Sequence, residues 1–119
     1  MAHVLLVDDH ADLRDVVAQM LEVHGHRVEI CDSAEAALEA LQAKLPDAII
    51  LDQRLPGMNG VELVKALRNN PRTAELQVIV YSADDSQAAA AKAAGASDFW
   101  LKGSDGLFEG IEGLGRELS

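Results

Sequence analysis

The sequence has little cysteine, few basic residues and no long apolar run. Its single cysteine, Cys31, cannot form a disulfide within the chain, which indicates a reducing compartment. Its neighbours Ile30 and Asp32 would not activate a thiol, so we expect a small buried side chain there. The longest apolar runs, such as residues 48–51, are far shorter than the roughly 20 residues that span a bilayer, and residues 1–3 lack the basic start of a signal peptide. We therefore expect a cytoplasmic protein with no membrane contact.

Basic side chains are outnumbered by acidic ones. The chain has 10 Lys and Arg against 20 Asp and Glu, a formal net charge of −10 with histidine neutral. This charge repels phosphate backbones, and the sequence has no cluster of Lys and Arg that would neutralise them. We therefore expect no direct contact with nucleic acid, and the acidic balance favours a bound cation or a basic partner.

The length and composition predict one folded domain over residues 1–119. A chain of 119 residues falls within the usual size of a single domain, and 49% hydrophobic with 25% charged residues is ordinary for a globular protein. No internal repeat, low-complexity tail or linker is visible. Whether this domain stands alone or was excised from a larger protein stays open.

Five short runs typical of strands alternate with longer helical patterns. The runs are residues 4–7, 27–30, 48–51, 76–81 and 99–101. Residues 4–7 are continuously apolar, as expected for a strand buried on both faces. The first helical stripe consists of Leu13, Val16, Val17, Met20 and Leu21, and the last of Leu107, Ile111, Leu114 and Leu118. Ser33 is placed as the N-cap of the second helix, and Asn59 with Glu62 forms a capping-box pattern at the start of the third. The alternation predicts an α/β fold: an open, doubly wound, five-stranded parallel sheet with helices on both faces.

Polar side chains follow four of the five predicted strands. Asp8 and Asp9 come after the first strand, Asp52 after the third, Ser82 after the fourth and Lys102 after the fifth. In sheets of this kind the ligand site lies at the carboxyl ends of the strands, so we expect these side chains to converge. A bound cation or Lys102 must offset the repulsion among three neighbouring carboxylates. Oxygen ligands select a hard ion, with Mg²⁺ the leading candidate.

This set of groups is suited to phosphoryl transfer. Asp52 can accept a phosphoryl group as an aspartyl-phosphate, while Mg²⁺, Lys102 and the Ser82 hydroxyl stabilise the phosphoryl oxygens. The sequence resembles the receiver domain of two-component response regulators, in particular the single-domain chemotaxis type, over essentially all 119 residues. The resemblance is carried by Asp8-Asp9, Asp52, Ser82, Lys102 and the turn Leu55-Pro56-Gly57-Met58-Asn59-Gly60.

The resemblance implies a fold, a metal site and partners. The fold is flavodoxin-like, (βα)5, with strand order 2-1-3-4-5. The implied Mg²⁺ ligands are Asp8, Asp9, Asp52 and the backbone carbonyl of Arg54. The phosphodonor is a phosphohistidine of a histidine kinase or a histidine phosphotransfer domain, and the domain catalyses only its own phosphotransfer and dephosphorylation.

The resemblance also implies a conformational switch. On phosphorylation Ser82 moves towards the phosphoryl group and the aromatic Phe99 rotates inward. The surface formed by the fourth helix, the fifth strand and the fifth helix then changes its preference for a downstream protein effector.

The sequence departs from the family pattern in two places. Gly103 follows Lys102 where the family usually has proline, often in a cis peptide. A cis bond without proline costs about 2.5–4 kcal/mol, so we expect a trans peptide and another path for this loop. Glycines are concentrated in the last predicted helix, where each costs roughly 0.5–1 kcal/mol relative to alanine. Both departures favour an alternative, a degenerate receiver that binds partners without phosphorylation.

An aspartyl-phosphate phosphohydrolase is a further alternative. That chemistry uses a second carboxylate two residues after the nucleophile, where this chain has Arg54, so we expect no turnover enzyme. Arg54 itself either influences phosphoryl transfer or is a bystander.

Several other residues have plain structural interpretations. We expect Asp84 to cap the fourth helix, His24 and His26 to lie in a surface turn, and Trp100 to pack in the core. Three glycines of the last helix, Gly106, Gly110 and Gly113, share one face and mark either a loosely ordered end or a place for a close partner helix.

Overall fold

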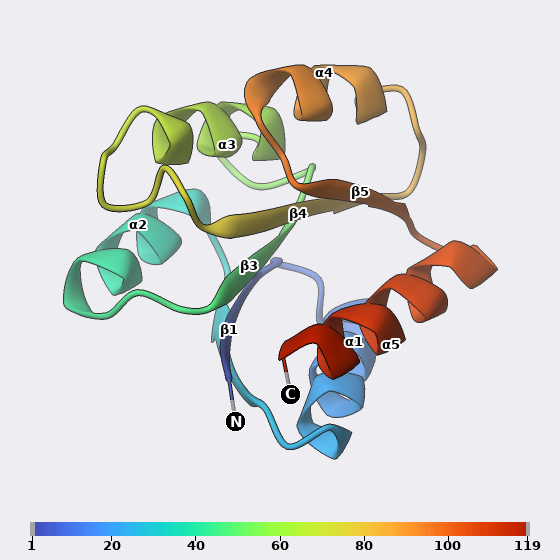
Figure 1. Ribbon diagram of the computed structural model, residues 1–119. Coiled ribbons are helices and arrows are strands. Elements are labelled where there is room, and N and C mark those ends of the chain that lie inside the picture. Colours follow the sequence, from blue (N-terminus) through green and yellow to red (C-terminus); the bar gives the residue numbers. More distant parts are fainter. Residues whose placement is uncertain (1, 119) are drawn as a thin grey trace.

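Five parallel strands alternate with five helices in the computed structural model, which describes residues 2–118. The elements in chain order are β1 (His3–Val7), α1 (Ala11–Val23), β2 (Arg27–Cys31), α2 (Ala34–Ala43), β3 (Ala48–Asp52), α3 (Gly60–Arg68), β4 (Gln77–Ser82), α4 (Ala88–Ala94), β5 (Asp98–Leu101) and α5 (Asp105–Leu118). The strand order is β2-β1-β3-β4-β5 (Figure 1). The predicted flavodoxin-like α/β fold and its strand order are confirmed.

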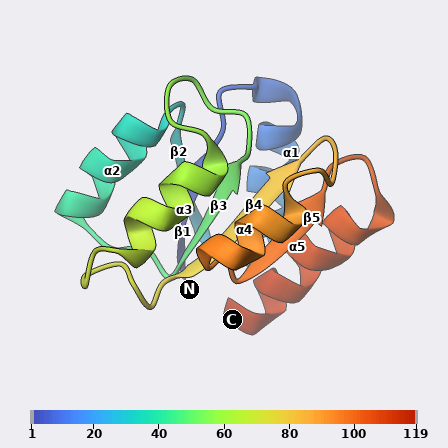
Figure 2. The ribbon, with the colours of Figure 1, turned by 90° about the horizontal axis from the view of Figure 1, so that it is seen from above.

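The sheet has a layer of helices on each face. Figures 1 and 2 show α1 and α5 together on one face and α2, α3 and α4 on the other. Successive strand residues point to opposite faces, so each central strand contributes to both layers of the core. In β1, for example, Leu5 and Val7 pack with α2 and α3, whereas Val4 and Leu6 pack with α1 and α5. Such two-sided burial explains why the central strands β1 and β3 consist largely of continuous apolar residues.

The predicted helix starts are confirmed where a side chain caps the helix. The Ser33 side chain accepts a hydrogen bond from the Ala36 amide at 3.1 Å, and Asn59 and Glu62 form a capping box at the start of α3. The expectation for Asp84 is wrong. Helix α4 begins only at Ala88, and the Asp84 carboxylate instead accepts a hydrogen bond from the Ser86 amide at 3.0 Å. Residues 83–87 thus form a turn that the alanine-rich helix does not include.

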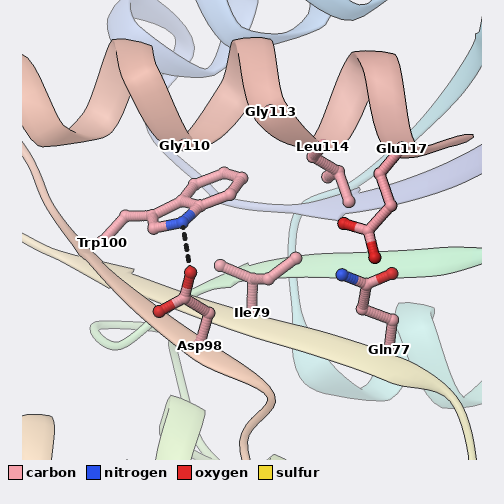
Figure 3. Close-up of a pocket in the computed structure, with 8 residues that line it drawn as sticks. All are labelled: Gln77, Ile79, Asp98, Trp100, Gly110, Gly113, Leu114 and Glu117. Atoms are coloured by element: carbon pink, nitrogen blue, oxygen red, sulfur yellow. Dashed lines mark hydrogen bonds between the residues drawn. The ribbon is translucent and has the colours of Figure 1, made fainter.

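Helix α5 packs closely against β5, the strand at one side of the sheet, where a glycine of the helix faces Trp100. The Trp100 side chain, buried as expected, lies beneath Gly110 and donates from Nε1 to Asp98 Oδ2 at 3.1 Å (Figure 3). A Cβ atom at Gly110 would lie 2.5 Å from this indole nitrogen, whereas one at Gly113 would meet no atom within 4 Å. The space at Gly110 is therefore filled by the chain's own indole and not by a partner helix.

The two histidines of the α1–β2 connection differ, and the surface interpretation of His26 is wrong. His26 is 4% exposed, accepts a hydrogen bond from the Ala2 amide at Nδ1, and contacts the Gly115 carbonyl from Nε2 at 2.7 Å. His24 is partly exposed and pairs with Glu112 at 3.1 Å. The turn therefore joins the start of β1 to the end of α5.

No helix within residues 2–118 is both long and apolar enough to cross a membrane.

Candidate functional site

The predicted site residues lie at the carboxyl edge of the sheet. Asp52 and Ser82 are the last residues of β3 and β4, Asp8 and Asp9 follow β1, and Lys102 follows β5. In the register of the parallel strands, Asp52 stands beside Tyr81 on β4. Strand ends rather than sequence proximity bring these side chains together.

The Asp52 carboxylate is buried and held at both oxygens. The Lys102 ammonium lies 3.1 Å from Oδ2, and the Arg54 amide donates to Oδ1 at 3.2 Å. Burial raises the pKa of Asp52, while the charge of Lys102 opposes this rise and the neighbouring Asp8 carboxylate adds to it. Asp52 and Lys102 line a pocket of ≈ 300 Å³ that also includes His10, Arg54 and Ala83. A small reactant can thus reach the carboxylate through this pocket, even though only 2% of the surface of Asp52 is exposed.

Asp8 and Asp9 have different surroundings. Asp8 is fully buried; its Oδ1 accepts a hydrogen bond from the His10 amide at 2.9 Å, its Oδ2 accepts one from the Tyr81 hydroxyl, and Lys102 lies 4.0 Å away. The Asp9 side chain is about one third exposed, at 35%. Asp9 therefore offers the more accessible oxygens of the pair, and Asp8 organises the groups around it.

Tyr81 is a site residue that the sequence reasoning treated only as part of a strand. Its hydroxyl donates to Asp8, and the Lys102 ammonium lies 4.4 Å from the centre of its ring. Burial, with the hydrogen bond to Asp8 and the charges of Asp8 and Asp52, raises the pKa of Tyr81 far above its usual value. The Tyr81 ring makes a cation–π contact with Lys102 and so holds the ammonium close to the carboxylates of Asp8 and Asp52.

His10 is a second residue that the prediction of the site missed. Its Nδ1 atom lies 2.8 Å from Asp9 Oδ1, 3.4 Å from Asp8 Oδ1 and 3.7 Å from Asp52 Oδ2. The signal in the sequence was its place directly after the acidic pair, which makes three consecutive side chains that can bind metals. The sequence analysis considered only oxygen ligands for this site and therefore did not include His10.

The side chains of Ser82, Arg54 and Phe99 contact residues other than Asp52. Ser82 is buried and lines an adjoining pocket of ≈ 450 Å³, and its hydroxyl oxygen lies 3.5 Å from the Asp84 amide. The exposed Arg54 side chain borders both pockets and reaches Asp84 at 3.4 Å. Phe99 is half-buried against the cluster formed with α2, α3 and α4. The structure therefore brings Asp8, Asp9, Asp52 and Lys102 together, whereas the contacts described for Ser82 and Phe99 are with other residues.

The side chains at this edge fit a bound cation. Asp8, Asp9, His10 and Asp52 each offer a ligand atom, and these four atoms lie within 4.8 Å of one another. The Lys102 ammonium contacts two of the three carboxylates, Asp8 at 4.0 Å and Asp52 at 3.1 Å. A divalent ion would therefore neutralise negative charge that this single lysine leaves uncompensated.

The backbone after Lys102 has a conformation that proline cannot adopt. No peptide bond in the described residues is cis, as expected for this loop, and Gly103 has φ = +75°. A positive φ is closed to proline and natural for glycine. Even with this different loop, the Lys102 ammonium reaches Asp52.

Comparison with known proteins agrees with the fold and the site. Residues 4–107 match the response regulator receiver domain, so the chain belongs to that family. As a receiver domain it is not a classical enzyme. The family implies a histidine kinase as partner.

Individual relatives and solved structures lead to the same family. The phosphate regulon transcriptional regulatory protein PhoB of Rhizobium meliloti is 35% identical over 101 residues, 83% of this chain and 44% of that protein. An uncharacterized 14.6 kDa protein of Leptolyngbya boryana is 34% identical, over 87% of this chain and 81% of its own length. The chemotaxis response regulator CheY4 of Vibrio cholerae superposes with a TM-score of 0.87 at 29% identity, covering 100% of this chain and 99% of that one. The chain thus spans less than half the length of PhoB and nearly all of CheY4.

Proposed function

We propose that this chain is a phosphoacceptor switch that takes a phosphoryl group from a phosphohistidine onto Asp52. The observation that carries the proposal is the 3.1 Å contact between Lys102 Nζ and Asp52 Oδ2, at a buried carboxylate that opens into a pocket. A lysine in this position can neutralise the negative charge of a phosphoryl group as it arrives at Asp52.

The reaction uses groups that already stand together. An Asp52 oxygen attacks phosphorus and forms an O–P bond, the N–P bond of the donor breaks, and its electron pair returns to the imidazole, which takes up a proton. Lys102 binds a phosphoryl oxygen, and Tyr81 holds Lys102 in place. Mg²⁺, held by Asp8, Asp9, Asp52 and the Arg54 carbonyl, would neutralise charge on the carboxylate and the phosphoryl oxygens.

The phosphorylated carboxylate would bias a conformational switch. A covalent group with a charge of about −2 stabilises the conformer that brings Ser82 and Lys102 closest to it. Ser82 would move from its contact with Asp84, and Phe99 would rotate inward on β5. The surface of α4, β5 and α5 would then bind a downstream protein effector in one state more tightly than in the other. Phosphorylation by a histidine kinase or histidine phosphotransfer domain goes with the cytoplasmic location expected from the sequence.

The alternative is a degenerate receiver that recognises partners without phosphorylation. Its support in the sequence is Gly103 and the glycine-rich α5. The placement of Lys102 next to Asp52 favours the phosphoacceptor, because a purely structural loop would not require an ammonium at that carboxylate.

Intact mass tests the proposal directly. The protein is incubated with Mg²⁺ and a small acyl phosphate, and the mass of the whole chain is measured. Wild type and the control Asp32→Asn, which removes an exposed carboxylate, should each gain one phosphoryl group. Asp52→Asn should gain none. No gain in wild type, or an equal gain in Asp52→Asn, would reject the phosphoacceptor.

A further inference from the structure

The His10 imidazole lies beside the three carboxylates that would bind a cation. Its Nδ1 atom is within 4 Å of one oxygen from each of three carboxylates, at 2.8, 3.4 and 3.7 Å. Neighbouring ligands of an octahedral ion with bonds of about 2.1 Å stand about 3 Å apart. The nitrogen is thus spaced from the three oxygens much as one ligand of a metal ion is spaced from the next.

The backbone of His10 is held by a hydrogen bond, whereas its side chain is largely exposed. The amide donates to Asp8 Oδ1 at 2.9 Å, and this bond ties His10, the N-cap residue of α1, to the acidic pair that follows β1. The side chain makes no capping hydrogen bond to the helix and is 67% exposed. A modest rotation can therefore point the nitrogen lone pair at an ion without moving the backbone.

The other histidines with a carboxylate partner lack this arrangement. Within residues 2–118, His3 and His24 each pair with one carboxylate, Glu29 and Glu112, and both lie away from the acidic cluster. His26 contacts backbone atoms through both ring nitrogens. Among the ion pairs of residues 2–118, the one imidazole that lies near three carboxylates is that of His10.

We infer that His10 is a nitrogen ligand of the metal site, so that the site binds divalent ions of the later first transition series more tightly than Mg²⁺. The inference rests on the metal site of the proposed function. Mg²⁺ prefers oxygen and gains little from an imidazole, whereas imidazole suits Ni²⁺, Cu²⁺ and Zn²⁺, whose affinity for a given site exceeds that of Mn²⁺. His10 thereby sets which metal occupies the site.

Calorimetric titration of the tag-free protein with Ni²⁺ and, separately, Mg²⁺ measures this selectivity. At one fixed pH, wild type should bind Ni²⁺ more tightly than Mg²⁺. His10→Ala should weaken Ni²⁺ binding about tenfold or more and leave Mg²⁺ binding within about twofold, because it removes one nitrogen and no oxygen. His24→Asn, which changes an imidazole that pairs with a single carboxylate, is the matched control and should leave both affinities unchanged.

Electron spin echo spectra of the Mn²⁺-loaded protein provide a readout independent of affinity. Wild type and His24→Asn should show coupling to a directly bound nitrogen, and His10→Ala should not. Equal Ni²⁺ affinity in wild type and His10→Ala, or absence of nitrogen coupling in wild type, would overturn the inference. Phosphorylation with Mg²⁺ in the mass experiment would still stand in that case, since failure of the proposed function appears there and not in the metal selectivity.

Discussion

The carboxyl edge of the sheet and the contact of α5 with its neighbours are built on opposite principles. At the edge, three carboxylates and one lysine are held close together, and burial raises the pKa of Asp52 because it disfavours the charged carboxylate. At the contact of α5, glycines leave room for neighbouring aromatic side chains. Trp100 packs under Gly110, and His24 packs against Gly115. The first region keeps an unfavourable arrangement that a ligand can relieve, whereas the second is already complementary. Stability should therefore respond to substitution in opposite directions in the two regions.

Adding a methyl group to the α5 contact should have the largest effect. In Gly110→Ala the new Cβ would lie 2.5 Å from the Trp100 nitrogen and 2.6 Å from Cε2. Because the indole is buried and held by Asp98, relief requires a shift of the helix or the ring, and we expect a loss of about 1–3 kcal/mol in the free energy of unfolding. Urea denaturation measures this loss.

Gly113→Ala is the matched control, since its Cβ would lie in open space on the same helix. It should gain about 0.5–1 kcal/mol from helix propensity. Equal effects of the two substitutions would show that the indole contact does not set the stability of α5.

Metal binding should stabilise the carboxyl edge by a somewhat smaller amount. An ion that binds only the folded chain adds about 1.4 kcal/mol at ten times its Kd. Mg²⁺ should therefore raise the Tm of wild type, and Asp9→Asn should weaken the response, because Asp9 offers the more accessible oxygens of the acidic pair. Thermal unfolding over a range of Mg²⁺ concentrations tests this, and an unchanged response in the variant would exclude Asp9 as a ligand.

Removing the charge of Asp52 should have the smallest effect, and its sign depends on pH. Since the pKa of Asp52 is raised in the folded chain, the folded state binds this proton more tightly than the unfolded state. Stability is therefore lost as pH rises from the ordinary aspartate pKa, about 3.9, through the raised value, and the loss persists at neutral pH. With metal removed by EDTA, Asp52→Asn should unfold at a higher temperature than wild type at pH 7.

The gain in Asp52→Asn should disappear below about pH 4, where the wild-type carboxyl is protonated in both states. Asp32→Asn serves again as the control for loss of a negative charge at an exposed site. A wild type that is as stable as Asp52→Asn at pH 7 would mean that Lys102 fully compensates the buried charge.

The fold was predictable because its signals are local and repeated. Continuous apolar runs mark strands buried on both faces, as at Ile49 and Ile50, and the capping box of Asn59 and Glu62 marks a helix start. The turn after β4 was mispredicted because the sequence 84–87 offers two ways to use the Asp84 side chain. It could cap a helix or bond to Ser86, and only packing decides between them.

The charged part of the site was predictable and its supporting groups were not. Parallel strands end at one edge, so Asp52 and Lys102 could be placed together from their order in the chain. The contacts of Tyr81 and His10 depend on which way each side chain turns within that edge. Likewise, the burial of His26 depends on the backbone of Ala2 and Gly115, which lie far from it in sequence.

Trp100 is an intrinsic fluorescent probe of the strand on which it lies. It is the only tryptophan in the chain, it lies on β5 next to Phe99 and two residues before Lys102, and its indole is buried with a hydrogen bond to Asp98. All indole fluorescence of the protein therefore originates from the strand that connects the site to the α5 surface. Rearrangement of this strand can be followed by its emission, with no label attached.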